Sequence, residues 1–340
     1  MIISKITLEN CLYYHLHAEQ TITAAFTDGR DLGILEKEVT IFTFDKIIFD
    51  YNGIQSDKPT NLILNFDGIE AIQNNVLPKI SELRKLNPNL VLINIKSTLI
   101  KELGLDNLFN NKNNKATDDG NFEVFYVSEN LNIEFNSSTI QIFEKRFLQL
   151  LIEKYIDPVE IDKSFHSSSS VYLPKWINIK NFISNDNPFF IYAIYNLAIK
   201  TYSKWKYLFD IDESYKPILV CQNLNSSYIS SILSNLLKTD ILILDQIGPI
   251  NKMYSTLDRK IENSKNYVVV SDLVCLGTEV KIAKSLIEFL GGNYLGNISI
   301  IRIQTIDPKH KDFRNTECVF TVDKTNNLVI GYKINTDLDN

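Results

Sequence analysis

The segment "VVVSDLVCLGTEV", Val268 to Val280, holds the residues whose types and order are best suited to chemistry. Three consecutive valines are typical of a buried parallel strand. Asp272 follows them, and Gly277 lies in the short stretch before a helical pattern resumes. Because glycine lets backbone N–H groups approach a ligand closely, and a helix N-terminus favours negative charge, the segment predicts a strand, an anion-binding loop and a helix.

Further apolar runs predict the sheet that must position this loop. Four strands are expected, and they alternate with helices or long loops: Ile218–Val220, Ile241–Leu244, Val268–Val270 and Ile298–Ile303. Their spacing favours a parallel, doubly wound α/β sheet, in which ligands bind at the carboxyl ends of the strands. Loops 222–227 and 271–278 should therefore meet at one edge. The long polar loop 246–266, which carries Lys252, is expected to act as a lid.

The region from Phe143 to Ile303 resembles the type I phosphoribosyltransferases, and its layout is nearest to orotate phosphoribosyltransferase. The family signature is four hydrophobic residues, an acidic pair, a short loop and Gly-Thr opening a helix, and "VVVSDLVCLGTEV" follows it. "VYLPKWINIK", residues 171–180, looks like a further strand of that enzyme. The resemblance implies binding of phosphoribosyl pyrophosphate or a nucleoside monophosphate, with Mg²⁺ bridging pyrophosphate and ribose oxygens.

The resemblance also implies a role for each matching residue. Asp272 would bind the ribose hydroxyls and Mg²⁺, and Lys252 on the lid would contact the leaving group. Asn225 and Ser226 would bind the pyrophosphate. The 5′-phosphate would lie on loop 271–278 and the start of the following helix. Its contacts there would be Ser271, Cys275, Leu276, Gly277 and Thr278.

Several positions depart from the family pattern. Ser271 replaces the first acidic residue, Glu279 places a carboxylate close to the expected phosphate, and "CQNLNSSY", residues 221–228, has no glycine. Since transfer of a ribosyl group depends on charge fixed before the reaction, these changes favour ligand binding over catalysis and make the chain a candidate pseudoenzyme. Whether it is an enzyme stays open. The alternative is a non-catalytic assembly protein that uses both α/β domains as docking modules.

The N-terminal half predicts a second α/β domain. Residues 61–109, "NLILNFDGIEAIQNNVLPKISELRKLNPNLVLINIKSTLIKELGLDNLF", resemble the STAS domain in their order of strand, Asp-Gly turn, helix and strand. The phosphorylatable Ser or Thr of that family is replaced by Gln73-Asn74-Asn75. The expected domains are 1–135, a module for homodimerisation or a protein partner, and 136–340. The polar run 110–121 has the composition of a loop or linker that divides the chain.

Composition narrows the class of protein. The four cysteines lie far apart and no cationic leader precedes the first apolar run, which indicates a reduced, cytoplasmic protein. No stretch reaches the roughly 20 apolar residues of a membrane span. A net charge of −6 makes long nucleic acid an unexpected partner. His15 and His17, two apart, would share one face of a strand, and a solvated strand is favoured over a metal pair.

Overall fold

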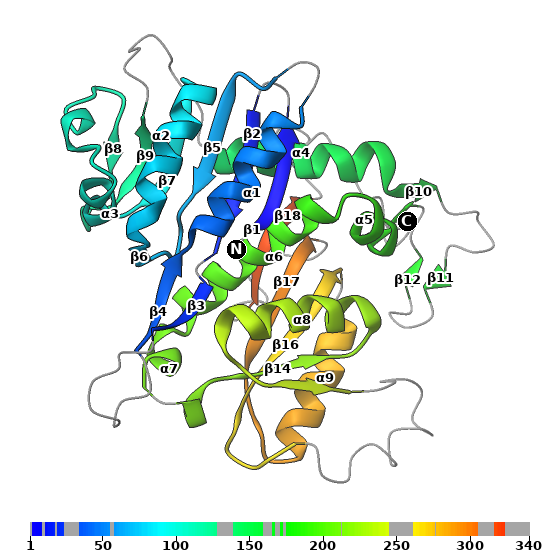
Figure 1. Cartoon of the computed structure of the whole chain (residues 1–340). Helices are drawn as coiled ribbons and strands as arrows, with labels where there is room; N and C mark the ends of the chain where they lie inside the picture. The colour runs from blue at the N-terminus through cyan, green and yellow to red at the C-terminus, as the bar shows by residue number, and fades with distance from the viewer. Residues whose placement is uncertain are drawn as a thin grey trace. The chain divides into compact units, whose positions relative to one another are not determined.

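The computed structural model describes residues 2–8, 11–17, 19–23, 34–54, 58–127, 139–158, 165–166, 171–172, 175–211, 213–244, 261–275, 277–304 and 316–323. The chain divides into two compact units, residues 1–138 and 139–340 (Figure 1). Each is an α/β unit, which confirms the α/β class of the prediction. Among the described residues, no helix is both long and apolar enough to cross a membrane.

The first unit is built on a mixed sheet with the strand order β1-β2-β5-β7-β9-β8. Neighbouring strands β2, β5 and β7 are parallel, whereas β1, β8 and β9 pair antiparallel. The strands are β1 (Ile2–Leu8), β2 (Cys11–Leu16), β5 (Asn61–Asn65), β7 (Leu90–Ile95), β8 (Lys115–Ala116) and β9 (Phe122–Tyr126). A smaller sheet has the order β3-β4-β6, comprising β3 (Glu19–Thr23), β4 (Ile34–Val39) and β6 (Ala71–Ile72).

The α-helices among the described residues of this unit are α1 (Ile41–Asn52), α2 (Leu77–Leu86) and α3 (Ser97–Glu102). The core joins leucines and isoleucines of the central strands to the apolar faces of α1 and α2, for example Phe44, Ile47 and Leu83. The predicted strand, helix and strand over 61–95 are all present. The turn at Asp67-Gly68 is present as well, with Gly68 at a φ of +73°.

Two expectations for this unit were wrong. Residues 110–121 do not divide the chain, because they form turns and strand β8 inside the first unit, where polar side chains bond the local backbone. His15 is not solvated but only 1% exposed. Strand β2 is an inner strand whose residues from Leu12 to Leu16 are all buried. Side chains that alternate between its two faces are therefore buried on both.

The second unit centres on a five-stranded, wholly parallel sheet with the order β15-β14-β16-β17-β18. The strands are β14 (Ile218–Cys221), β15 (Ile241–Ile243), β16 (Asn266–Val274), β17 (Asn293–Gln304) and β18 (Thr316–Asp323). The four predicted strands are confirmed, and β18 is additional. Short pieces precede this sheet: β10 (Ile156–Pro158), β11 (Phe165–His166), β12 (Val171–Tyr172) and β13 (Lys175–Ile177).

The described helices of this unit are α4 (Thr139–Lys154), α5 (Ile179–Asn185), α6 (Asn187–Lys204), α7 (Lys206–Phe209), α8 (Leu224–Leu237) and α9 (Thr278–Phe289). Of these, α6, α8 and α9 contact strands of the sheet. Helices α6 and α8 pack against each other and against sheet strands (Figure 1). Helix α9 joins a core with Val220, Val269 and Tyr267 through its buried Ala283 and Ile287. The sheet is thereby held between helices, as its apolar strands require.

Candidate functional site

The carboxyl ends of β14 and β16 form the place in the second unit where strand order reverses. From β14 the chain continues to β15 on one side, and then returns to β16 on the other side of β14. The β14–β15 and β16–β17 connections run in opposite directions along the sheet, so they carry α8 and α9 to opposite faces, since parallel connections are right-handed. The two loops therefore diverge at this edge, and ligands bind at such a place in open parallel sheets.

Asp272 lies within β16, at this edge. The prediction ended the strand at Val270, but the structure extends it to Val274, because the long partner strand β17 continues the ladder as far as Arg302. One carboxylate oxygen accepts a bond from the Asn225 side-chain amide at 2.7 Å, and the other from the Leu273 N–H at 2.9 Å. Burial raises the pKa of Asp272 above its usual value, while these two bonds act in the opposite direction.

The start of α8 presents Asn225 to Asp272. Asn223 is the N-cap residue, and its side chain accepts a bond from the Ser226 N–H at 2.8 Å. The Ser226 hydroxyl accepts in return from the N–H groups of Gln222 and Asn223, which completes a capping box. Ser226 is fully buried, so both of its groups are committed to the cap. Asn225, one position earlier, is only partly buried and lies at the edge.

Helix α9 begins at the same edge of the sheet, after β16. Gly277 precedes it with a φ of +72°, in the left-handed region that favours glycine, and Thr278 opens the helix. Among the described residues, no N-cap side chain bonds this end of the helix, since the N-cap position is Gly277. The Gln222 amide donates to the Glu279 carbonyl oxygen at 3.3 Å and thereby joins the β14–α8 loop to the first turn of α9.

Other predicted site residues lie differently. Ser271 alternates with Asp272 and lies on the other face of β16, where its hydroxyl accepts a bond from the Asn297 amide at 3.2 Å. Burial raises the pKa of the Cys275 thiol to about 11, so the thiol stays protonated at neutral pH. Leu276 and Lys252, with most of the predicted lid, lie outside the described residues. The sequence placed Gln222 in a loop expected at this edge but indicated no contact for it, and Asn297 was not predicted.

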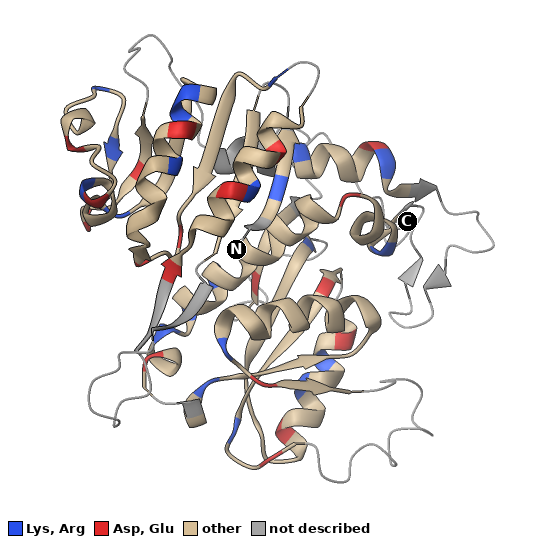
Figure 2. Ribbon diagram, viewed as in Figure 1, with Lys and Arg blue, Asp and Glu red and all other residues tan. Residues whose placement is uncertain are grey.

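The described residues near Asp272 carry few charges, and those that interact with it are acidic. Figure 2 shows basic and acidic residues distributed over both units, and α8 has none along its length. Glu279 is close enough to contribute to the raised pKa of Asp272. A phosphate here would rely on backbone N–H groups more than on described cationic side chains.

Magnesium fits this edge only together with a ligand. Mg²⁺ prefers oxygen donors and is usually held by one or two carboxylates plus substrate phosphates. Asp272 supplies one carboxylate, and Ser271 faces away. Within the described ranges, no three His, Cys, Asp or Glu side chains are grouped so as to hold a metal. A magnesium ion held here would need oxygens from the bound ligand.

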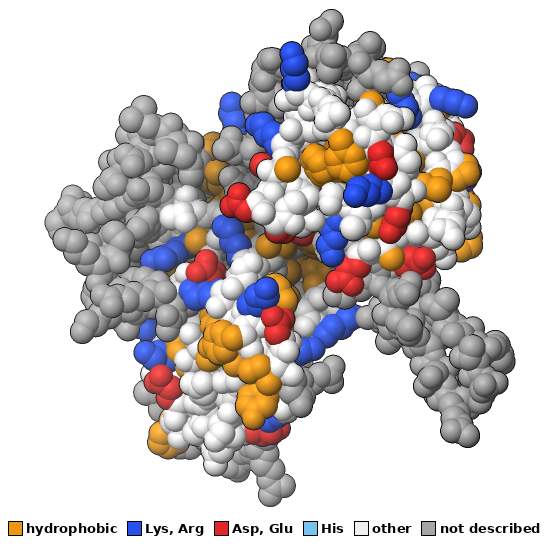
Figure 3. All heavy atoms as spheres, turned by 90° about the vertical axis from the view of Figure 1, so that its left-hand side faces the viewer, with side chains coloured by type: hydrophobic (Ala, Val, Ile, Leu, Met, Phe, Trp, Pro, Cys, Tyr) orange, Lys and Arg blue, Asp and Glu red, His pale blue; other side chains and the backbone are white. Residues whose placement is uncertain are grey.

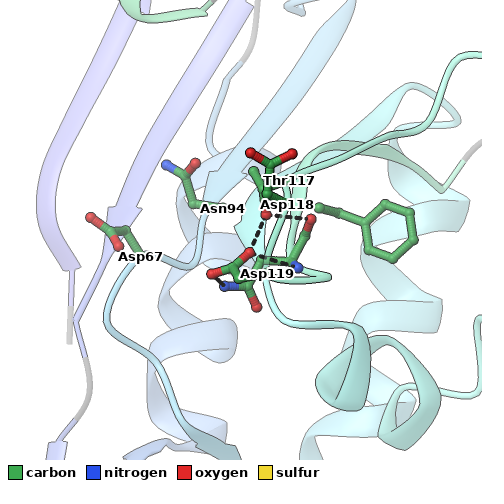
Figure 4. A pocket seen from close by; sticks show the side chains of 7 residues that line it. Asp67, Asn94, Thr117, Asp118 and Asp119 are labelled. Carbon is green, nitrogen blue, oxygen red and sulfur yellow. Dashed lines mark hydrogen bonds between the residues drawn. The ribbon is translucent and has the colours of Figure 1, made fainter.

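The first unit contains a pocket of about 390 Å³, beyond the carboxyl ends of β5 and β7 (Figure 4). Its lining is polar and acidic: Asp67, Asn94, Thr117, Asp118, Asp119, Asn121 and Phe122. Asp119 accepts bonds from the Asn121 backbone and side chain, so part of this polarity closes the local turn. An acidic lining without a cation is unsuited to a phosphate, and the edge formed by β14 and β16 in the second unit remains the candidate anion site.

Comparison with known proteins gives structural neighbours only. No protein-family model and no curated protein matches the chain. Among solved structures, adenine phosphoribosyltransferase from Rhodothermus marinus is 14% identical over 52% of this chain and 98% of its own, with a TM-score of 0.36. The corresponding enzyme from Thermoanaerobacter pseudethanolicus is 18% identical over 43% and 88%, with a TM-score of 0.33.

Orotate phosphoribosyltransferase from Aeropyrum pernix is a third neighbour, 12% identical over 45% of this chain and 82% of its own, with a TM-score of 0.33. Because these TM-scores are below 0.5, the similarities assign no function and no functional residue to this chain.

Proposed function

We propose that the second unit binds a 5′-phosphorylated ribose, as phosphoribosyl pyrophosphate or as a nucleoside monophosphate, at the edge formed by the carboxyl ends of β14 and β16. The observation that supports this most is the position of Asp272, a partly buried carboxylate at the reversal of strand order, held by Asn225 at 2.7 Å. A carboxylate is a natural acceptor for two neighbouring hydroxyl donors.

The phosphate in this proposal lies at the N-terminus of α9. Gly277 turns the backbone there and, as the N-cap residue, has no side chain to bond the first N–H groups of the helix, which begins at Thr278. Backbone N–H groups and the helix dipole then favour an anion. Asn225 and Gln222 lie at the same edge and are the proposed contacts for a second phosphate or for ligand oxygens. Lys252 is the proposed lid residue for a leaving pyrophosphate.

Binding without efficient transfer is the favoured activity. Stabilising a departing pyrophosphate requires preorganised charge, and this edge offers one carboxylate beside neutral amides. Mg²⁺, when bound, would neutralise pyrophosphate charge. Asp272 would hold it together with ligand oxygens. The chain's own groups orient the sugar and bind its phosphate.

The first unit is proposed to be a STAS-like docking module. Its parallel strands β2, β5 and β7, with helices packed against them, support an α/β module. The segment that would carry a phosphorylatable residue instead begins a 3₁₀ turn at Asn74, and α2 follows at Leu77. The proposed role is contact with another protein chain and does not involve a phosphorylation switch.

Calorimetric titration of the full chain tests the ligand proposal. Phosphoribosyl pyrophosphate and a nucleoside monophosphate are each titrated with and without Mg²⁺, and the matching nucleoside without phosphate is the control. We expect saturable heat with at least one phosphorylated ligand and none with the nucleoside. Absence of heat with every phosphorylated ligand would favour the assembly alternative. Release of pyrophosphate in the presence of a nitrogenous base would show that transfer does occur.

A further inference from the structure

Helix α1 of the first unit has an outer face with two exposed aromatic side chains. Its inner face, which includes Phe44 and Ile47, is part of the core. On the outer face Phe42 is 76% exposed and Phe49 is 79% exposed. Two phenylalanines seven residues apart differ by only about 20° around a helix, so they form one stripe. Exposed apolar stripes of this kind mark contact surfaces more often than a single exposed residue does.

Two opposite charges flank the stripe, one on each side. At about 100° per residue, Asp45 projects to one side of the line from Phe42 to Phe49 and Lys46 projects to the other. Both are exposed. Lys79 of α2 pairs with Asp45 at 2.8 Å, and this ion pair fixes the side on which the Asp45 carboxylate lies. The outer face is therefore apolar along its centre. One flank is acidic on balance, because the carboxylates of Asp45 and Glu82 outnumber the ammonium of Lys79 that pairs with both, and the other flank carries Lys46.

We propose that this face binds a second copy of the chain, with the two α1 helices side by side and parallel. A two-fold axis along the helix direction exchanges the flanks, so that Asp45 of each copy faces Lys46 of the second copy. Phe42 and Phe49 then pack against their own counterparts along the centre. An antiparallel arrangement would instead bring Asp45 against Asp45, which disfavours it. The arrangement of apolar and charged side chains on α1 is therefore complementary to itself under a two-fold axis parallel to the helix, as a closed homodimer requires.

The area of the stripe limits how tight this dimer can be. Each phenylalanine at this exposure offers about 150 Å², so two copies bury about 600 Å² of aromatic surface. Stable interfaces bury at least roughly 1,200 Å². The proposed dimer is accordingly weak, with a dissociation constant of order 100 µM. It belongs to the first unit and does not depend on the ligand site of the second.

Sedimentation equilibrium of the full chain over a range of concentrations tests this proposal. We expect reversible dimerisation, weakened at least tenfold in the Phe42→Ser/Phe49→Ser variant because the buried aromatic area is lost. The Phe289→Ser variant is the matched control, since Phe289 is 80% exposed on α9, and its dissociation constant should be unchanged. A wild-type chain that stays monomeric at about 1 mM, or a dimer unaffected by the double change, would overturn the proposal.

Charge exchange tests the symmetry separately from the aromatic area. The Lys46→Asp chain carries two acidic flanks and the Asp45→Lys chain two basic flanks, so each homodimer should weaken, by roughly tenfold for two pairs. Mixed together, the two variants should form a heterodimer at least as tight as the wild-type dimer. Equal dissociation constants for the two homodimers and for the heterodimer would contradict the proposed pairing of Asp45 with Lys46. Far-ultraviolet circular dichroism confirms that each variant is folded.

Discussion

The side-chain amide of Asn225 donates a hydrogen bond to the carboxylate of Asp272 across 2.7 Å. The two residues are 47 positions apart, and they come from different strand–helix connections, at the start of α8 and in β16. Their contact joins the two segments that border the reversal of strand order. The bond from Asn225 lowers the pKa of Asp272 and so favours the charged carboxylate, in opposition to the larger effect of burial, which raises the pKa.

Replacing Asn225 with Leu should shift the pH dependence of ligand binding upward. Burial already raises the pKa of Asp272, and loss of the amide donor removes a contribution that lowers it. Binding that needs the charged carboxylate falls as pH drops through that pKa, so the fall should begin at higher pH in the variant. The measurement is the dissociation constant for the ligand across pH 4 to 8, roughly the range over which raised carboxyl pKa values lie.

Asn235→Leu is the control for this change. Asn235 lies on the same helix, is exposed, and donates only to the carbonyl oxygen of Ser231, one turn away. An identical pH profile for the Asn225 variant and the wild type would mean that the amide does not govern the charge of Asp272.

Replacing Gly277 with Ala should destabilise the second unit by about 1 to 2 kcal/mol, because its φ of +72° is left-handed and strained for any residue with a Cβ. Gly53→Ala is the matched control. Gly53 has a φ of −71°, and an added Cβ would meet its nearest neighbours at an ordinary 3.5 Å. Urea unfolding followed by circular dichroism measures both. Equal effects would show that the left-handed turn before α9 is not what requires glycine.

Replacing Glu279 with Gln should strengthen binding of a phosphorylated ligand severalfold. The carboxylate lies in the first turn of α9 and already opposes the charge on Asp272. In a partly exposed position the repulsion is screened, which keeps the effect modest and makes it smaller at high salt. Affinity for the nucleoside monophosphate at low and high salt gives the measurement. Weaker binding in the variant would place the phosphate away from α9.

Stability of the first unit should fall in acid because of His15. Burial, reinforced by the neighbouring His17, lowers the pKa of His15 from 6.5 to about 3. The unfolded chain therefore takes up a proton below about pH 6.5 while the folded chain does not, so stability is complete above that pH and is lost as pH falls toward 3.

The His15→Gln variant should lose less stability than the wild type between about pH 7 and pH 4.5, as measured by urea unfolding. Glutamine can still bond the Asn65 amide, which lies 3.3 Å from the His15 ring nitrogen. All other titrating groups are common to both chains, so the difference isolates His15. Equal losses of stability in the wild type and the His15→Gln variant would show that the His15 ring is charged or exposed in the folded state.

The sheet of the second unit could be predicted because its strands are short runs of β-branched and leucine residues. The valines at 268–270 and the isoleucines at 298–303 needed no tertiary information. Gly277 and Thr278 likewise marked the start of α9 correctly. Strand β18 lacks such a run, since "TECVFTVD" mixes polar and apolar residues and lies at the edge of the sheet.

What could not be predicted depends on neighbours in space. Ser271 and Asp272 are polar, which suggested a loop, yet pairing with β17 keeps them in a strand and sends their side chains to opposite faces. Ser226 matched a ligand-binding position in sequence, but its hydroxyl is committed to the α8 cap. His15 is buried because both faces of β2 are covered, which no local pattern reveals.

The most direct test of the account is calorimetric titration of the Asp272→Asn chain beside Asp240→Asn. Both changes remove one carboxylate, but Asp240 is exposed and immediately precedes β15, at the amino edge of the same sheet. We predict that Asp272→Asn abolishes the heat of binding of the phosphorylated ribose ligand, whereas Asp240→Asn leaves it unchanged. Undiminished binding by the folded Asp272→Asn chain would contradict the proposed ligand site.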